Sequence, residues 1–282
     1  MSTATAETYG PSALGGEARR FVELTITLAR TEFKLRYYGS VLGYVWSLMR
    51  PLLFFGVIYV FFVKIAHIAK GPYYGAYLLT AIVLWNYLAE ATATSVTCLV
   101  AREAMLRKIR FPRMVVPLSV SLTATFNLGM NSIAVFVFAF ASGVTPTIEW
   151  LEMIPIVLLF VVLATGIAML LSALYVRFRD VQPIWEVFLQ IWFYGSPVIY
   201  PATAYVSHKF PSGFEKIAMI NPVATLLAQM GHAFIDPNGY PTATGAAHAV
   251  WPVVIALALI PGVFALGWWV FTREAPRVAE NL

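Results

Sequence analysis

Charged residues are scarce in this sequence. Asp, Glu, Lys and Arg make up 12% of its 282 residues, whereas 60% of the residues are hydrophobic. Ordinary soluble domains carry about 25% charged residues, and a chain of this length cannot bury so much apolar surface in its own core. The composition therefore excludes a purely water-soluble protein and indicates that a lipid bilayer is part of the solvent.

Cysteine is almost absent. The single Cys98 lies inside an apolar run, so neither a disulfide nor a cysteine-based zinc site can form within one chain. Residues 1–18 are small and polar, without the apolar segment of a signal peptide. We expect these residues to form a disordered tail.

Side chains suited to catalysis or metal binding are also few. Gly10 and Gly15 have the spacing of a phosphate-binding loop, but Gly16 and Glu17 occupy the places of the required Lys and Ser/Thr. The acidic residues are scattered, which argues against a membrane-embedded transferase. We predict no catalytic residue, no metal site and no bound cofactor, so that ATP and Mg²⁺ for any driven transport belong to a separate subunit. Metal-ligand spacing is missing among the four histidines, which are His67, His208, His232 and His248.

Long apolar runs dominate the rest of the sequence. A membrane-spanning helix needs about 20 apolar residues, and no internal repeat relates the runs that reach this length. We predict an all-α polytopic membrane protein, with six transmembrane helices in a domain covering 39–272. The predicted spans are 43–65, 76–100, 114–141, 153–176, 181–201 and 249–271.

Positive charge is distributed unevenly among the connecting loops. All but four of the 19 Lys and Arg residues fall on the side that holds the N-terminus. An excess of Lys and Arg marks the cytoplasmic side, so we expect both termini, including the tail 273–282, to be cytoplasmic. The net charge of +5 then reflects topology, and we expect no nucleic-acid partner. The four exceptions are Lys64, Lys70, Lys209 and Lys216.

Residues 19–38 precede the first span and have the pattern of an amphipathic helix. Apolar residues fill most of the surface outside one polar face, which predicts a helix in the cytoplasmic membrane interface. Two roles remain open, a juxtamembrane anchor and a docking surface for a cytoplasmic partner. The polar face consists of Glu23, Thr27, Arg30 and Lys34.

The inner loop 102–113 joins the second and third spans. Its basic residues can simply fix the topology. The spacing of its apolar residues, however, favours a short helix that ends before Pro112, and such a helix can insert into a groove of another protein. Fixing the topology and docking on another protein both remain open for this loop. The residues that would form the docking surface are Arg102, Glu103, Met105, Leu106, Arg107, Lys108, Ile109 and Arg110.

The outer segment 202–248 contains a second group of short elements. Asn221 and Pro222 form a favourable N-cap and first-turn pair for a helix over 222–235. This apolar helix is too short to span the bilayer, so we predict a re-entrant or interfacial helix, with another short helix between 212 and 220. Irregular backbone at this depth must be buried by protein or line a wet cavity, so the region should border a transport pathway.

Glu90 is the most unusual polar residue in the predicted spans. A carboxylate near the bilayer centre costs about 2.5–3.5 kcal/mol on insertion scales, so it should face protein or water. Two interpretations remain open. Glu90 either lines a polar conduit or proton relay, or is a neutral carboxyl group hydrogen-bonded between helices.

Aromatic residues are abundant, at 15% of the chain. Most Trp and Tyr residues of membrane proteins form interfacial belts, but Trp85 and Trp192 fall well inside predicted spans. Aromatic rings with a polar edge suit both the apolar faces and the hydroxyls of sugars, and they would also suit a conduit for a drug. We therefore predict a conduit lined by Trp85, Glu90, Trp192 and Tyr194.

Four short motifs occur in order along the chain, and together they resemble the ABC-2 type permeases that export polysaccharides and polyol phosphates. The resemblance covers roughly residues 20–270 and is carried by the order of the motifs. Members of this family often carry a basic residue in the helix after Asn-Pro. In that helix this chain has Gln229, Gly231 and His232. The motifs are "RYYGS" at 36–40 with "LGYVWS" at 42–47 and Pro51, Arg179-Asp180, "GSPVIYP" at 195–201, and Asn221-Pro222.

The resemblance implies a multi-pass protein of the bacterial cytoplasmic membrane. It would be a homodimer of six-span subunits that binds two copies of a cytoplasmic ABC ATPase. The amphipathic N-terminal helix would lie on the membrane, and loop 102–113 would be the coupling helix. The cargo would be a lipid-linked glycan such as O-antigen, teichoic acid or another cell-wall polymer. The short outer helices would act as a gate, with Ser196, Pro197, Tyr200, Asn221 and Pro222.

In the light of this resemblance, the "RYYGS" segment gains a role in cargo uptake. Arg36 and Arg50 would meet phosphate of lipid or cargo at the inner face, beside a group of interfacial rings. This segment favours the glycan branch over an ABC-2 exporter of a drug or small lipid. An ion-coupled secondary transporter without an ATPase is the alternative from another class. The rings are those of Tyr37, Tyr38, Tyr44 and Trp46.

Overall fold

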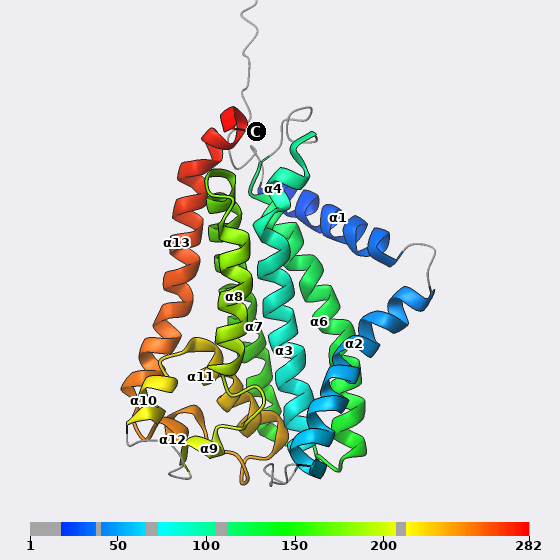
Figure 1. The fold of residues 1–282 in the computed structure, drawn as a ribbon, viewed down its shortest axis with the longest axis vertical. Coiled ribbons are helices and arrows are strands. Elements are labelled where there is room, and N and C mark those ends of the chain that lie inside the picture. Colours follow the sequence, from blue (N-terminus) through cyan, green and yellow to red (C-terminus); the bar gives the residue numbers. More distant parts are fainter. Residues whose placement is uncertain (1–17, 38–40, 66–72, 105–111, 207–212, 282) are drawn as a thin grey trace, which may run out of the picture.

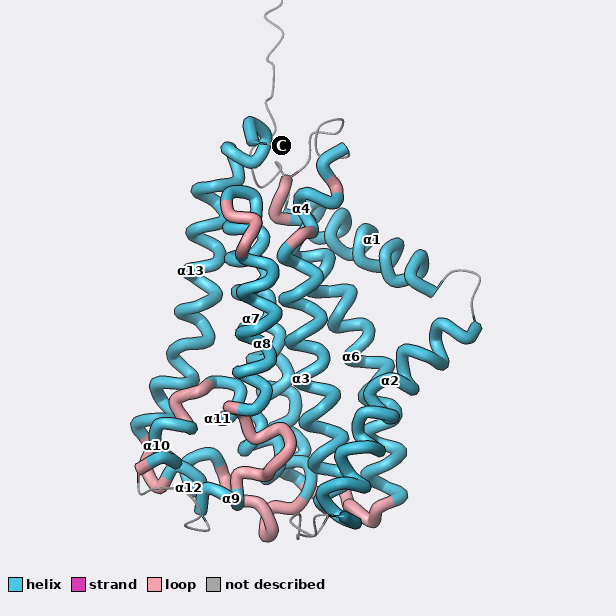
Figure 2. The backbone as a smooth tube through the Cα atoms, viewed as in Figure 1, coloured by secondary structure: helices cyan, strands magenta, loops and turns pink. Residues whose placement is uncertain are grey.

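The computed structural model describes residues 18–37, 41–65, 73–104, 112–206 and 213–281. Every regular element in these ranges is helical (Figure 2). Long helices run side by side, α1 crosses them at one end, and short helices gather at the other end (Figure 1). The C-terminal end of α13 lies at the same end as α1. We call this the inner end, and the opposite one the outer end, after the predicted topology.

Within the described ranges, four helices are long and apolar enough to cross a membrane: Trp46–Ile65, Val115–Ala141, Ile148–Arg177 and Trp251–Glu274. They match the first, third, fourth and sixth predicted spans and confirm a polytopic membrane protein. The last of them is longer than predicted, since its helix continues through most of the segment expected as a tail. The elements concerned are α2 (Val41–Tyr59) with the π-helical η1 (Val60–Ile65), α6 (Val115–Ala141), the 3₁₀-helical η2 (Ile148–Glu152) with α7 (Met153–Arg177), and α13 (Trp251–Asn281).

The second predicted span forms α3 (Tyr74–Val96), which contacts α2, α6, α7 and α8. The helix is interrupted at Thr97, and α4 (Cys98–Ala101) follows. Polar residues such as Asn86 lower its hydropathy, and α3 is not among the four candidate spans. Most of its side chains are nevertheless buried, so neighbouring helices, rather than lipid, surround it.

The fifth predicted span is wrong in its length. Helix α8 (Val181–Tyr194) has 14 residues, or about 21 Å at 1.5 Å per residue, whereas the hydrocarbon core is about 30 Å thick. After Gly195 the chain turns, and Val198 N donates to Ser196 O at 2.7 Å. Pro197 has no N–H with which to continue a helix. A set of six spans therefore stays a prediction.

Helix α1 (Ala18–Tyr37) confirms the helix predicted over 19–38. Its buried face packs against α6. Thr123 Oγ1 donates to Ala29 O at 3.3 Å, and the Phe33 and Phe126 rings meet edge to face with centroids 5.8 Å apart. Leu35 remains exposed on another face. Its position at a membrane surface stays a prediction, and residues 1–17 of the predicted tail lie outside the described ranges.

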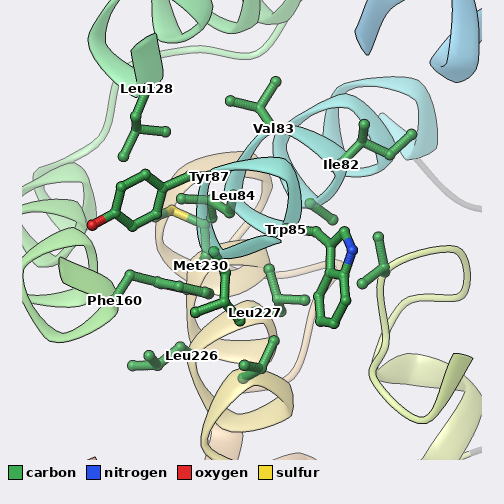
Figure 3. Packing of buried hydrophobic residues seen from close by; sticks show 14 of the residues in the cluster. Ile82, Val83, Leu84, Trp85, Tyr87, Leu128, Phe160, Leu226, Leu227 and Met230 are labelled. Carbon is green, nitrogen blue, oxygen red and sulfur yellow. The ribbon is translucent and has the colours of Figure 1, made fainter. Parts of the chain in front are cut away.

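The main core surrounds α3 (Figure 3). Trp85 and Tyr87 of this helix are buried among side chains from α6, α7 and α11, and Phe160 and Met230 are among their neighbours in the cluster. Helices far apart in the sequence therefore meet at α3, which makes it the central element of the described bundle.

The outer end carries short helices, as predicted for the segment after the fifth span. Asn221 Oδ1 accepts a hydrogen bond from Val223 N at 3.0 Å, and Pro222 occupies the first turn. Both features confirm the predicted N-cap, and η3 extends the helix to the predicted end at Ile235. The elements are α9 (Thr203–Val206), α10 (Phe214–Ala218), α11 (Pro222–Met230), η3 (Gly231–Ile235) and α12 (Ala243–Ala247).

Candidate functional site

A pocket of about 860 Å³ opens between α1, α2, α3 and α6. Arg36, Trp46 and Arg50, three of the residues predicted for cargo uptake, line this pocket. Glu90, predicted for the conduit, lines it as well. The structure thus brings together two groups of residues that the sequence analysis had placed apart.

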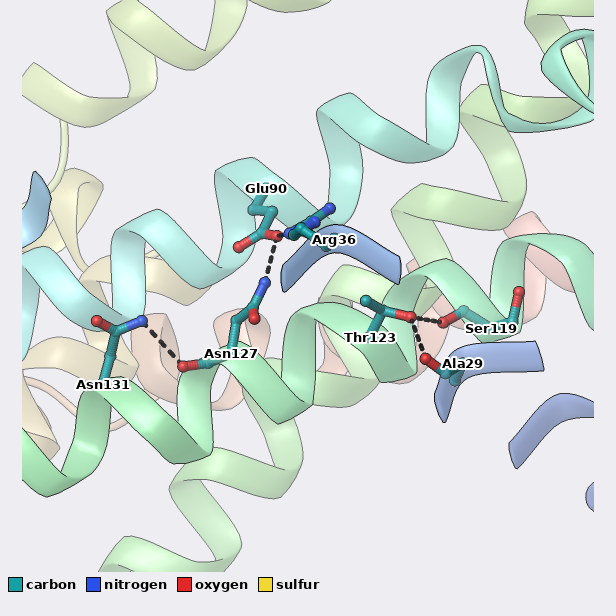
Figure 4. A network of polar contacts seen from close by, with 7 residues as sticks. All are labelled: Ala29, Arg36, Glu90, Ser119, Thr123, Asn127 and Asn131. Carbon is teal, nitrogen blue, oxygen red and sulfur yellow. Dashed lines mark hydrogen bonds and ion pairs between the residues drawn. The ribbon is translucent and has the colours of Figure 1, made fainter. Parts of the chain in front are cut away.

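An ion pair joins two walls of the pocket. Arg36, in the last turn of α1, forms a salt bridge with Glu90 of α3 (Figure 4). Asn127 Nδ2 of α6 donates to the same carboxylate oxygen at 2.6 Å. The Arg36 and Glu90 side chains are 39% and 30% exposed, so both remain accessible from the pocket.

These contacts contain an element of each interpretation offered for Glu90, whose role in transport stays a prediction. The side chain is hydrogen-bonded between helices, and it also lines a polar pocket. Glu90 lies in the last two turns of α3, between the middle of the helix and its inner end. This position next to α1 gives it a cationic partner.

The sequence analysis missed the asparagines of this site. Asn86, Asn127 and Asn131 all line the pocket, and Asn131 Nδ2 donates to Asn127 O at 2.9 Å. Amides are unusual in an apolar span, and Asn127 and Asn131 are four residues apart, so they share one helical face. That spacing was a usable signal for a polar wall on α6.

The aromatic part of the uptake prediction is described only at Trp46. Its side chain is 60% exposed and lines the pocket. Tyr38 and the side chains of Tyr37 and Tyr44 lie outside the described parts of the chain. Arg50 forms no salt bridge with any residue in the described ranges. It therefore adds a positive charge that no described carboxylate neutralises.

A second ion pair attaches α1 to the beginning of the predicted coupling loop. Arg102 Nη2 pairs with Glu32 Oε1, and both side chains are 21% exposed. Burial raises the pKa of Glu32 above its ordinary value, although the charge of Arg102 lowers it. Glu32 and Arg36 are four residues apart, so one face of α1 meets both the loop and the pocket. Glu103 is described, whereas Met105, Leu106, Arg107, Lys108, Ile109 and Arg110 lie outside the described residues.

Asn221 connects the elements of the outer end. Its Nδ2 donates to Ser196 Oγ at 2.8 Å, and its Oδ1 accepts from Trp192 Nε1 at 2.9 Å in addition to the cap of α11. The "GSPVIYP" and Asn-Pro motifs, more than twenty residues apart in sequence, are therefore joined by side-chain hydrogen bonds.

Tyrosine hydroxyls of α3 hold the turn after α8. Tyr74 OH donates to Ile199 O at 2.7 Å, and Tyr77 OH donates to Pro197 O. Tyr200, another predicted gate residue, donates from its hydroxyl to Tyr194 O at 2.9 Å. The structure thus gathers the predicted gate residues into one cluster. Tyr74 and Tyr77 were not predicted as part of this cluster, although two tyrosines three residues apart at the outer end of a span share one helical face.

Two of the aromatic residues predicted for the conduit, Trp85 and Trp192, pack against each other. Trp85 is only 6% exposed, and its ring meets Trp192 edge to face with centroids 5.9 Å apart. Trp185 Nε1 donates to Thr92 Oγ1 at 3.1 Å on the same helix pair. Tyr194 is 69% exposed. In the single chain these rings attach α8 to α3, and their role in a conduit stays a prediction.

These features define a helical, multi-pass membrane protein with a cationic pocket at one end and a hydrogen-bonded cluster at the other. The ABC-2 type transporter family matches residues 23–232. That match covers well over half of the sequence, and the chain belongs to this family.

Curated relatives agree with this assignment. The chain is 30% identical over 215 residues to an O-antigen export system permease protein RfbA of Klebsiella pneumoniae, covering 76% of this chain and 81% of the relative. It is 27% identical over 220 residues to the protein of the same name in Myxococcus xanthus, covering 78% and 83%. As an ABC-2 permease with apolar helices, it is a multi-pass protein of the bacterial inner membrane.

Proposed function

We propose that this chain is the permease subunit of an ATP-binding cassette exporter that moves a lipid-linked polysaccharide across the cytoplasmic membrane. Family membership supports the ABC exporter, and the relatives named O-antigen export permeases support the polysaccharide. The observation that carries the proposal is the inner pocket, which combines two arginines with a half-exposed tryptophan.

The chemistry of the pocket suits a lipid-linked glycan. The linking phosphates are anionic and pair with guanidinium groups, while a sugar ring can stack its apolar face on an indole. Arg36, Arg50 and Trp46 supply these groups beside hydrogen-bonding amides. Cargo phosphate would bind between the arginines, and the first sugars would lie against Trp46.

The complete exporter would contain two copies of this chain and two copies of a cytoplasmic ABC ATPase, which hold ATP and Mg²⁺. Each permease would contribute six spans, of which α3 would be the second and α8 the fifth. Membrane lipids would surround the dimer. Residues 102–113 would dock on the ATPase. The Glu32–Arg102 ion pair supports this arrangement, because it offers a direct link from the docking loop to α1.

The cluster around Asn221 would be the outer gate. Its hydrogen bonds join α8, the following turn and α11. Movement of α11 would therefore displace Ser196 and the end of α8 together. Glycan leaving the conduit would pass this cluster, as predicted for Ser196, Pro197, Tyr200, Asn221 and Pro222.

Two alternatives predict different behaviour. A drug or small-lipid exporter of the same family would respond to apolar compounds, and the two pocket arginines argue for an anionic cargo instead. An ion-coupled transporter would use Glu90 as a proton carrier, whereas in the structure Glu90 forms a salt bridge with Arg36. Such a transporter would also work without an ATPase.

The test is purification of the chain with its ATPase subunit, followed by ATPase measurements in lipid nanodiscs. We expect a polyprenyl diphosphate-linked oligosaccharide to raise the ATPase rate severalfold, and a neutral polyprenol to have no effect. Failure to isolate an ATPase complex, or full transport by this chain alone, would refute the proposal.

The coupling role of the inner loop has its own test. Replacing Met105, Leu106 and Ile109 together with Asp should abolish the stimulated ATPase rate, because charged side chains cannot enter an apolar groove. The exposed Ile148, at the outer end, serves as the matched control. Ile148→Asp should leave the stimulated rate unchanged, and normal stimulation in the triple variant would exclude docking through this loop.

A further inference from the structure

The pocket contains its own anion. In the structure Glu90 forms a salt bridge with Arg36. The phosphate of the proposed cargo would bind the same guanidinium group. We propose that Glu90 is a built-in competitor for Arg36, which the diphosphate of the cargo must displace, and that it thereby selects diphosphates over the singly charged phosphates of membrane lipids. This inference rests on the proposed function and names a specificity-determining residue within it.

The geometry allows the exchange. Both members of the ion pair are partly exposed to a pocket of about 860 Å³, so a ligand can reach Arg36 without passing through the core. Asn127 Nδ2, at 2.6 Å, still donates to the Glu90 carboxylate after Arg36 has turned away. The displaced carboxylate therefore keeps a hydrogen bond, which lowers the cost of breaking the ion pair.

Charge explains the selectivity. A diphosphate carries more negative charge and more acceptor oxygens than a carboxylate, and it can bind a guanidinium through two parallel hydrogen bonds. A phosphodiester of an ordinary phospholipid carries one charge, as Glu90 does, and gains little by replacing it. Repulsion by the displaced Glu90 opposes either anion, so the additional hydrogen bonds and charge pairing of the diphosphate decide which one binds. Arg50, which forms no salt bridge with a described residue, offers the second charge that a diphosphate can use.

Displacement would also alter the attachment of α1. Arg36 of α1 forms a salt bridge with Glu90 of α3. Glu32, one helical turn before Arg36, forms a salt bridge with Arg102. When a ligand takes Arg36, the first salt bridge is lost while the second remains. Ligand binding in the pocket would therefore change the position of α1, and the Glu32–Arg102 salt bridge would pass this change to the start of the coupling loop.

The experiment uses the complex of this chain and its ATPase in nanodiscs and compares Glu90→Gln with Arg36→Gln. Both substitutions break the same ion pair, so a purely structural pair predicts the same direction of effect. A competitor predicts opposite effects. Glu90→Gln should lower the half-maximal concentration of a polyprenyl diphosphate-linked oligosaccharide about tenfold, which corresponds to about 1.4 kcal/mol. Arg36→Gln should raise it or abolish stimulation.

Lipid composition separates the two sources of phosphate. In phosphatidylcholine with added phosphatidylglycerol, the wild-type complex should respond to the glycan as it does in pure phosphatidylcholine. The Glu90→Gln complex should lose part of its gain in affinity, because phosphatidylglycerol now competes for Arg36. Equal sensitivity of both complexes to phosphatidylglycerol would overturn the proposed selectivity.

Glu32→Gln breaks the ion pair between α1 and Arg102 and tests for loosening of α1. Glu23→Gln is the matched control, since it removes the same charge and an exposed ion pair with Arg19 from α1, and neither residue lines the pocket. We expect no change in the half-maximal glycan concentration in either variant. If Glu32→Gln lowers that concentration as Glu90→Gln does, loosening of α1 explains the effect and the competitor is disproved. Size-exclusion chromatography checks that each variant assembles. A wild-type complex without any glycan response would instead refute the proposed function.

Discussion

Gly267 of α13 lies directly against the backbone carbonyl of Gly166 of α7. A Cβ at Gly267 would collide with that carbonyl, and a Cβ at Gly166 would stand 2.6 Å from Phe264 Cα. Real Cβ atoms essentially never come so close to backbone atoms. The two glycines therefore let α7 and α13 touch through their backbones, as small residues do in membrane helix pairs.

This contact predicts a large effect of a single methyl group. Gly166→Ala should lower the free energy of unfolding by about 1–3 kcal/mol, because the two helices must move apart. Thermal unfolding of the purified chain in detergent measures the change. Gly262→Ala on α13 is the control, since a Cβ there meets nothing within 4 Å. Equal melting temperatures of both variants would argue against the close crossing.

Asn221 should be the most sensitive polar residue of the outer cluster. Asn221→Ala removes hydrogen bonds to Ser196, Trp192 and the first turn of α11, and we expect a loss of about 1–3 kcal/mol. Trp192→Phe removes one of these bonds and should cost less. Asn238→Ala, at an exposed position, is a suitable control. An Asn221→Ala protein as stable as the control would show that the cluster does not hold the outer end together.

The Glu32–Arg102 ion pair should be measurable in a double-mutant cycle. Either Glu32→Gln or Arg102→Gln should destabilise the chain by about 1.5–3 kcal/mol, since a charged hydrogen bond at a mostly buried position is lost. The double variant should lose less than the sum of both. Strictly additive melting shifts would mean that the two side chains do not interact.

Trp46 should contribute to export without contributing much to stability. The side chain is half exposed and lines the pocket, so Trp46→Ala should reduce glycan export about 3–10-fold through the loss of about 1 kcal/mol of ring contact. Trp269→Ala removes a similarly exposed tryptophan outside the pocket and should leave export unchanged. Equal export by the two variants, at matched expression, would remove Trp46 from the proposed uptake site.

The sequence by itself determined the features that depend on neighbouring residues. Apolar run length identified α2, α6, α7 and α13, because the bilayer thickness sets the length of a spanning helix. Asn221 and Pro222 predicted the start of α11, because an N-cap residue satisfies backbone groups in the first turn of the helix that it precedes. The ordered motifs were enough to indicate the family, which the match over residues 23–232 confirms.

Only the tertiary structure decided which helix faces meet. Arg36 and Glu90 are 54 residues apart, and nothing in the local pattern of either one names the other. Asn221 likewise donates a hydrogen bond to Ser196, which lies in the turn after α8. The same turn ends α8 at Tyr194, before the apolar run of the sequence ends. The physical reason is that hydropathy and capping act within one helix, whereas pairing depends on the crossing and rotation of several helices, which the whole packed bundle fixes together.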